Sequence, residues 1–206
     1  MEEFPIIPEK TALLFFDVQN TGWHSKDAEV AAAVDASGII PRLVKLSEAC
    51  REAGIPVFYS QADHRPDYKD WLPHIVGNPP APTPKMVDLV SGSWYVTIIP
   101  ELEPKPGDYV VQKHRWSAFH QTHFELSLRT RGIDTIIIAG GATNVGIAST
   151  AYAARDRDYN LIVLSDGCRT RDPYINDYFM SDIFPKFARV MTVDQAIGKI
   201  AVPVSA

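Results

Sequence analysis

The stretch TALLFFD, residues 11–17, is apolar from its second to its sixth residue and then ends on a carboxylate. Five other short runs have a similar character. They are IPVFYS at 55–60, DYVVQK at 108–113, DTIIIAG at 134–140, NLIVLSD at 160–166 and ARVMTV at 188–193. These runs are rich in Val, Ile and Phe with little polar alternation, which is typical of strands buried on both faces of a parallel sheet. We predict a six-stranded, mainly parallel sheet.

The segments between these runs have helical spacing. Apolar residues recur mainly every three or four positions across 39–49 and 145–152, and Phe124 and Leu128 stand four apart in a third segment. Gly54 follows the segment 39–49, and Gly132 follows the segment 124–128. Glycine is common just beyond helix C-termini. Strands that alternate with helices imply crossover connections, with helices on both faces of the sheet. The predicted fold class is therefore α/β, a three-layer α/β/α doubly wound architecture.

The length and composition are those of one ordinary globular domain. The chain has 206 residues, of which 46% are hydrophobic and 22% charged. We expect a single domain spanning residues 1–206. The formal net charge of -5 and the lack of long basic runs disfavour nucleic acid as a partner.

Neither a membrane span nor an export signal is evident in the sequence. No apolar stretch approaches the roughly 18 residues that a span requires, and the first residues are acidic where a signal peptide is basic. We expect a cytoplasmic protein with no membrane contact. Cys50 and Cys168 are the two cysteines, and Cys50 lies in an apolar helical pattern, so we do not expect a structural disulfide.

One connection, residues 61–94, is much longer than the others. It carries six prolines and the aromatic residues Tyr68, Trp71 and Trp94. Connections in compact domains usually have about 4–6 residues, so a much longer one is commonly functional. We favour a folded lid or a subunit contact over a passive insertion.

The chemistry is expected beyond the carboxyl ends of the strands, where an open parallel sheet binds its ligands. Asp17 ends the first run, and its apolar surroundings predict a raised pKa and a role as acid or base. An equally reasonable role is a loop or cap contact. Lys113 ends the third run, so both side chains are expected at one edge, where they can hold a substrate carboxylate or share a proton.

The segment from Gly140 to Gly146 is rich in glycine and leads into a helix near Asn144, which is a suitable cap. Its backbone N–H groups are a candidate anion or oxyanion site. The sequence has neither a dinucleotide fingerprint nor a P-loop, so we expect no nucleotide cofactor, and indeed no cofactor of any kind.

At these residues the chain resembles the isochorismatase-like, or cysteine hydrolase, superfamily. The resemblance rests on LLFFDVQN, PGDYVVQKHRWSAF, RGIDTIIIAGGATNVGIASTAYAARDRDYN and SDGCRT, which occur in this order along nearly the whole chain. It implies a Rossmann-like hydrolase fold and a non-proline cis peptide near Gly141-Ala142. In amide-cleaving relatives the triad is Asp, Lys and Cys, and the positions here that match are Asp17, Lys113 and Gly146.

Glycine has no side chain, so the family's acyl-cysteine route is closed at Gly146. The resemblance offers another precedent: isochorismatase itself lacks the cysteine and cleaves a vinyl ether by acid catalysis, releasing pyruvate. The predicted roles are Asp17 as general acid, Lys113 as the orienting cation and Gly146 as space with a backbone N–H. Ser117, Thr143 and Cys168 are weighed as replacement nucleophiles, against packing or capping roles.

Two other functions remain open: a slow amide or ureido hydrolase that has lost its cysteine, and a non-catalytic protein that binds a small acid. We expect a small-molecule carboxylate, flat or cyclic, as substrate. The predicted substrate-binding residues are Gln19, Gln61, Trp94, Trp116, Ala142, Thr143 and Val145. Asp63, His64 and His74 resemble metal ligands of nicotinamidase-like relatives, but we expect no metal. The resemblance also implies a homodimer or homotetramer.

Overall fold

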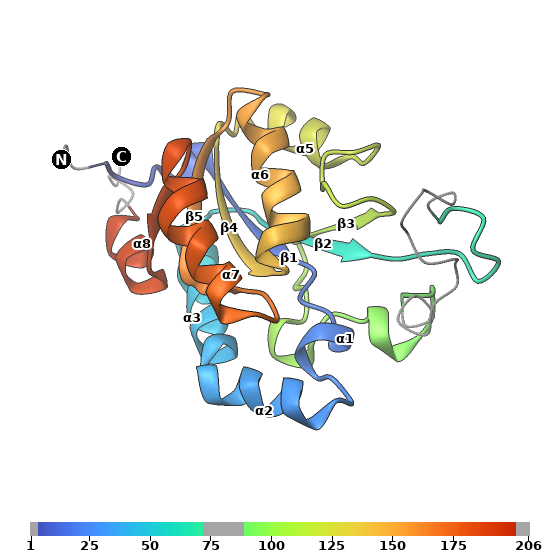
Figure 1. Ribbon diagram of the computed structural model, residues 1–206. Coiled ribbons are helices and arrows are strands. Elements are labelled where there is room, and N and C mark those ends of the chain that lie inside the picture. The colour runs from blue at the N-terminus through green and yellow to red at the C-terminus, as the bar shows by residue number, and fades with distance from the viewer. Residues whose placement is uncertain (1–3, 72–88, 201–206) are drawn as a thin grey trace.

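The computed structural model describes residues 4–71 and 89–200. Its centre is a six-stranded sheet in which every neighbouring pair is parallel, in the order β3-β2-β1-β4-β5-β6 (Figure 1). The strands are β1 (Thr11–Phe16), β2 (Val57–Ala62), β3 (Tyr109–Lys113), β4 (Thr135–Gly141), β5 (Asn160–Arg169) and β6 (Arg189–Met191). The predicted strands and fold class are confirmed. The chain reverses its direction of winding between β1 and β4, which places a topological switch point beside Asp17.

Both faces of the sheet are covered, as the unbroken apolar strands predicted. Every residue of β1 is buried, and successive side chains enter different cores: Leu13 and Phe15 one, Leu14 and Phe16 the other. The first core is completed mainly by α2 (Ala28–Ser37), α3 (Ile39–Glu52) and α8 (Val193–Lys199), the second by α5 (Phe124–Thr130) and α6 (Ala148–Arg155). This is the predicted three-layer arrangement.

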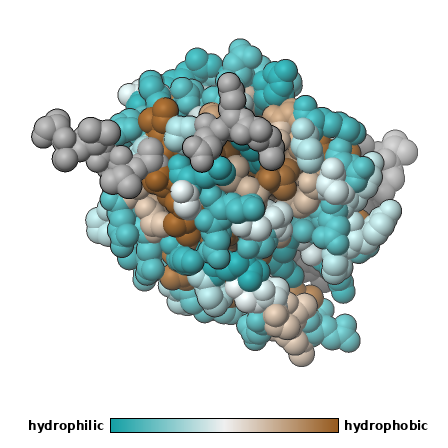
Figure 2. Space-filling model, turned by 90° about the vertical axis from the view of Figure 1, so that its left-hand side faces the viewer, coloured by the Kyte–Doolittle hydropathy of each residue, from teal (hydrophilic) through white to brown (hydrophobic). Residues whose placement is uncertain are grey.

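The two remaining α-helices of the described chain are short: α1 (Asn20–Trp23) follows β1, and α7 (Pro173–Tyr178) follows β5. The described ends of the chain meet where Ile6 bridges Ile200, beside α8. Figure 2 views this side of the molecule, where hydrophilic residues cover most of the surface and small apolar areas show between them. In residues 4–71 and 89–200, no helix has the length and apolar character needed to cross a membrane.

The long connection after β2 is tied together at its base. His64 and Val90 form a parallel bridge, in which the His64 N–H donates to Leu89 O at 2.8 Å and the Ser91 N–H donates to His64 O at 2.8 Å. The predicted lid or subunit contact lies largely in 72–88, outside the described residues, as does His74. Of the two tryptophans in the described parts of this connection, Trp71 lines the cavity described below, whereas Trp94 packs against Tyr95.

Candidate active site

Asp17 and Lys113 meet at the carboxyl edge of the sheet, although their strands are not neighbours. Lys113 Nζ donates to Asp17 Oδ2 at 2.8 Å, so the lysine reaches across the end of β2. The Lys113 side chain is only 4% exposed. A solvated surface lysine, the alternative reading of Lys113, is therefore excluded, and the predicted acid–cation pair exists.

The local backbone holds the Asp17 carboxyl in one place. Asp17 has φ of 46°, a left-handed conformation that few residues other than glycine adopt and that often marks functional sites. Its N–H donates to Ser60 O at 3.2 Å, and its carbonyl accepts the Trp23 indole N–H at 3.0 Å. The Ser60 hydroxyl donates to Asp17 Oδ1 at 2.7 Å, so both carboxylate oxygens have a donor. Serine 60 is a positioning residue that the sequence did not single out.

Burial raises the pKa of the Asp17 carboxyl above its usual value of 3.8, because desolvation penalises the charged form. The Lys113 ammonium and the Ser60 hydroxyl act in the opposite direction and limit the rise. Desolvation and Lys113 thus shift the pKa of Asp17 in opposite directions, and desolvation is the larger effect.

At Gly146, the place where a nucleophilic side chain would begin is already filled by the ring of Phe16. A Cβ atom built on Gly146 would lie 2.1 Å from Phe16 Cε1 and 2.6 Å from Phe16 Cζ, far inside van der Waals contact. Phe16 is fully buried, and Lys113 Nζ lies 4.7 Å from the centroid of its ring. The aromatic face thus offers the lysine a cation–π contact from the volume that a thiolate would occupy.

The core around position 146 is therefore packed for glycine. The neighbouring ring fills the space in which a side chain would begin, so glycine leaves no void there.

The predicted cis peptide is present at Gly141-Ala142. Just before it, Gly140 has φ of 127°, and a Cβ there would meet Phe16 O at 2.2 Å. Beyond it, a π-helical turn over Thr143–Ile147 leads into α6. The expectation that Asn144 caps this helix is wrong: Ala142 occupies the cap position without a side-chain bond, and Asn144 Oδ1 accepts the Thr170 hydroxyl at 2.7 Å.

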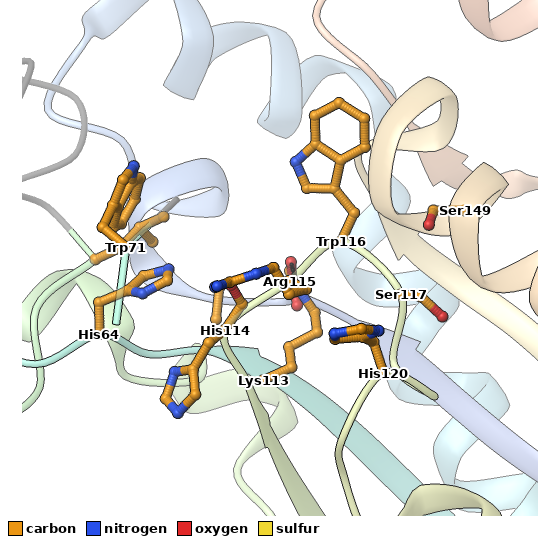
Figure 3. A pocket seen from close by; sticks show the side chains of 12 residues that line it. His64, Trp71, Lys113, His114, Arg115, Trp116, Ser117, His120 and Ser149 are labelled. Atoms are coloured by element: carbon orange, nitrogen blue, oxygen red, sulfur yellow. Dashed lines mark hydrogen bonds and ion pairs between the residues drawn. The ribbon is translucent and has the colours of Figure 1, made fainter. Parts of the chain in front are cut away.

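A cavity of about 680 Å³ opens beside the Asp17–Lys113 pair. Figure 3 shows its wall, with His64 and Trp71 on one side, Arg115 and Lys113 in the middle, and Trp116, Ser117, His120 and Ser149 on the other. Asp17, Lys113 and Trp116 are the predicted site residues that line it. The remaining lining residues are Ala62, His64, Trp71, Leu89, His114, Arg115, Ser117, His120 and Ser149.

Several predicted substrate contacts have structural roles instead. Gln19 is 1% exposed, and its amide bonds main-chain atoms of Ala62 and Val96. Gln61 likewise donates to Val96 O at 2.8 Å. Trp94 stands edge-on to Tyr95, away from the cavity lining. Gln19 and Gln61 thus bind the segment around Val96 to the ends of β1 and β2. From the sequence alone, such a structural role cannot be told apart from substrate binding.

The glycine-rich segment is also absent from the described cavity lining. Ala142, Thr143, Val145 and Gly146 are not among the residues that line it, and α6 contributes Ser149, further along the helix. Thr143 is fully buried and its hydroxyl donates to Asn176 Oδ1 at 2.7 Å. The expected oxyanion site is therefore not part of this cavity.

The three candidate replacement nucleophiles, Ser117, Thr143 and Cys168, lie in different surroundings. Cys168 is buried, its thiol donates to Ile138 O at 3.5 Å, and desolvation raises its pKa to about 12. The Thr143 hydroxyl is buried and already donates to Asn176, as described above. Ser117 lines the cavity, but its oxygen accepts the Phe119 N–H at 3.2 Å in a local turn. Cys50 is a free, buried thiol as well, so the described structure holds no disulfide.

A group of possible metal ligands is present, and of the residues named from the sequence it includes His64, but not Asp63. His64, Asp70 and His114 bring one ligand atom each within 4.8 Å of one another. His114 Nδ1 already lies 2.5 Å from Asp63 O, and the Arg65 N–H donates to the Asp70 carboxylate at 3.1 Å. Asp63 itself is bound to Ser91 and Gln112. Two of the three residues, Asp70 and His114, thus already bond to other protein groups.

Comparison with known proteins agrees with this geometry. Residues 11–195 match the model of the isochorismatase domain. The chain belongs to the isochorismatase family. The isochorismatase family protein YecD of Escherichia coli O157:H7, described as uncharacterized, is 33% identical over 80% of this chain and 85% of its own length. A ureidoacrylate amidohydrolase of Methylobacterium radiotolerans is 34% identical over 84% of this chain and 72% of its own.

Among solved structures, an isochorismatase family protein from Burkholderia thailandensis superposes with a TM-score of 0.78 and 28% identity, covering 95% of this chain and 98% of that one. The fold is therefore that of the isochorismatase family, and the chain is a hydrolase of that family. In this isochorismatase-family chain, sequence reasoning assigned no substrate contact to Trp71 or Arg115 and named His64 only as a possible metal ligand. Trp71 was noted in the long connection and Arg115 stands in a quoted motif, but their convergence on one cavity needs the loop geometry.

Proposed function

We propose that this protein is a hydrolase in which water, and not a side chain, attacks the substrate, with Asp17 as the proton-transfer group. The observation that carries the proposal is the Phe16 ring, which occupies the volume of the missing nucleophile over Gly146. An acyl-enzyme at this position would need that ring to move. The reaction that fits best is hydrolysis of an enol (vinyl) ether of a small carboxylate, with release of pyruvate.

The steps of this reaction need only an acid, a cation and water. Asp17 protonates the methylene carbon of the enol ether, and the resulting oxocarbenium ion takes up water. The Asp17 carboxylate takes back the proton that this water loses, and the hemiketal collapses to pyruvate and an alcohol as its hydroxyl proton passes to the leaving oxygen. The raised pKa of Asp17 supports its acidic role, and Lys113, 2.8 Å away, is placed to balance the charge left on its carboxylate.

A second candidate is hydrolysis of a ureido or amide bond by water that Asp17 activates as a base. It is favoured by the relatives named ureidoacrylate amidohydrolase, one of which is 34% identical to this chain. Without a cysteine this route would also be non-covalent. A third outcome, binding of a small acid without turnover, would leave the cavity and the Asp17–Lys113 pair as a receptor site.

The experiment is a substrate panel on the unmodified protein. Isochorismate and simpler enol ethers are assayed for pyruvate, and ureidoacrylate and related amides for ammonia. Pyruvate release that Asp17→Asn abolishes supports the first candidate. Ammonia release with the same dependence on Asp17 replaces it with the second, and binding without either product overturns both.

A further inference from the structure

The side of the cavity formed by His64 and Trp71 holds polar groups that have no role in the chemistry proposed for Asp17 and Lys113 (Figure 3). Trp71 Nε1 is buried and has no hydrogen-bond partner among the described residues. His64 Nδ1 is in the same condition: it approaches Asp70 Oδ2 at 3.4 Å without a hydrogen-bonding geometry. Buried polar atoms are nearly always paired. Since His64 Nδ1 faces Asp70, the indole N–H of Trp71, a lining residue, is the unpaired group that points to a ligand.

Arg115 lines the same cavity, and in the described chain only one nitrogen of its guanidinium, Nη1, is hydrogen-bonded to protein. Its Nη1 donates to Asp70 O at 2.9 Å and to His114 O at 2.7 Å, while Nε and Nη2 have no partner in the described chain. Since Asp70 directly precedes Trp71, the first bond ties Arg115 to the segment that carries the indole. In Figure 3, Arg115 lies between the His64–Trp71 side and Trp116.

The charges lining the cavity favour an anion here. Among the described residues that line the cavity, Asp17 is the one carboxylate, and it is paired with Lys113, so Arg115 has no carboxylate partner in this described lining. Asp70 is not among the described lining residues, and its carboxylate accepts the Arg65 N–H and contacts the His64 and His114 imidazoles. A planar guanidinium edge suits a planar carboxylate through two parallel hydrogen bonds.

We propose that Arg115 and Trp71 form a carboxylate-binding subsite that holds the acid group of the substrate away from its reacting bond. His64 supports this subsite by packing against Trp71, with ring centroids 4.0 Å apart. Lys113, committed to Asp17 and to the Phe16 ring, does not bind that carboxylate. The inference deepens the proposed function, on which it rests: the substrate is an acid whose carboxylate lies at the Arg115 end and whose scissile bond lies at Asp17.

Binding of simple probes tests the subsite without any turnover. Crotonate and its neutral analogue crotonamide are titrated by calorimetry in the presence of EDTA, and the indole N–H signals are followed by NMR, with Trp71→Phe identifying the Trp71 signal. Crotonate is expected to bind more tightly than crotonamide and to shift the Trp71 indole signal. Arg115→Gln is expected to weaken crotonate binding roughly 10- to 100-fold, as for loss of a charged hydrogen bond, and to leave crotonamide unaffected.

Arg65→Gln is the matched control. Arg65 is a nearby arginine that pairs with Asp67 at 2.7 Å and does not line the cavity, so its loss removes the same charge without touching the subsite. Equal weakening in both variants, or a Trp71 signal that does not move, overturns the proposal. Crotonate binding that occurs only without EDTA also overturns it, in favour of a metal held by His64, Asp70 and His114. Selective binding through Arg115 with no turnover of any substrate keeps the subsite and overturns the proposed function.

Discussion

At the scale of single residues, the contact between Phe16 and Gly146 is the feature on which the proposed chemistry rests. Position 16 lies on β1 and position 146 at the start of the helix after β4, so their contact depends on how the two elements pack. The sequence predicted that an acyl-cysteine route is closed. It did not predict that an aromatic ring fills the space, because the direction of the Phe16 side chain follows from the strand register.

The first prediction concerns the coupling of these two residues. Gly146→Cys alone is expected to destabilise the protein by about 1–3 kcal/mol through overpacking against Phe16, and Phe16→Ala alone by about 3–5 kcal/mol through a cavity. The double variant should lose less than the sum, by about 0.5–3 kcal/mol, because each change relieves the other. Urea unfolding of the four proteins measures this.

Gly22→Cys combined with Phe16→Ala serves as the control, since a Cβ at Gly22 would meet nothing within 4 Å. Its effects should add. Additive losses for Gly146→Cys with Phe16→Ala would mean that the ring does not block a side chain at 146. The same double variant, assayed with amides and examined for a thioester by mass spectrometry, shows whether the opened volume accepts a working nucleophile.

The second prediction is the pH dependence that Asp17 imposes. In the enol-ether reaction the protonated carboxyl is the active form, so kcat/KM should fall as pH rises through the raised pKa of Asp17. Lys113 lowers that pKa, so in Lys113→Met the falling limb should move to higher pH. Asp17→Asn should lower the rate roughly 10²- to 10⁴-fold. A rate that rises through the same limb would assign Asp17 as a base, as water-driven amide hydrolysis requires.

The third prediction separates this protein from cysteine-dependent relatives. Cys50 and Cys168 are buried, and desolvation raises the pKa of each thiol to about 12, so both stay protonated and unreactive near neutral pH. Iodoacetamide should neither modify the native protein nor inhibit turnover. Intact-mass spectrometry checks this, with the urea-unfolded protein, where both thiols should react, as the positive control. Loss of activity that parallels the addition of one iodoacetamide-derived group would contradict this prediction and assign a catalytic role to a thiol.

At the scale of elements, the order and type of strands could be predicted, and the details at their ends could not. The strands were recognisable because both faces of the sheet are buried, so apolar residues run without interruption. The meeting of Asp17 and Lys113 also followed from strand ends at one edge. Gln19 and Gln61 stand at the same edge, but their amides bond the chain around Val96, which returns from a distant segment.

The fourth prediction belongs to the join between β4 and the helix that follows it. Gly140 combines φ of 127° with a backbone approach that leaves no room for Cβ, 2.2 Å from Phe16 O. Gly140→Ala should therefore cost about 3 kcal/mol or more, because backbone atoms cannot be displaced cheaply. Thermal or urea unfolding measures the loss.

Gly54→Ala is the comparison. Gly54 also has positive φ, 77°, but nothing lies within 4 Å of a Cβ there, so only the conformational cost of about 1–2 kcal/mol applies. Equal losses at Gly140 and Gly54 would show that the close approach to Phe16 does not add to the cost.

At the scale of the whole molecule, the family and its layers follow from sequence, while the cavity does not. Arg115, Trp71 and His64 come from two separate connections, and only their folded arrangement reveals a common wall. The homodimer or homotetramer expected from the family stays a prediction. Trp116, 63% exposed at the cavity, is suited to cover by a second copy. Light scattering should give a mass two or four times that of the chain, and a monomer would contradict this.

The contact between Phe16 and Gly146 also sets how a nucleophile could be engineered into this site. A side chain at position 146 meets the Phe16 ring, and shrinking residue 16 first leaves a void. Either change made alone is expected to cost stability, so a library that seeks a working cysteine at this position should vary both residues together.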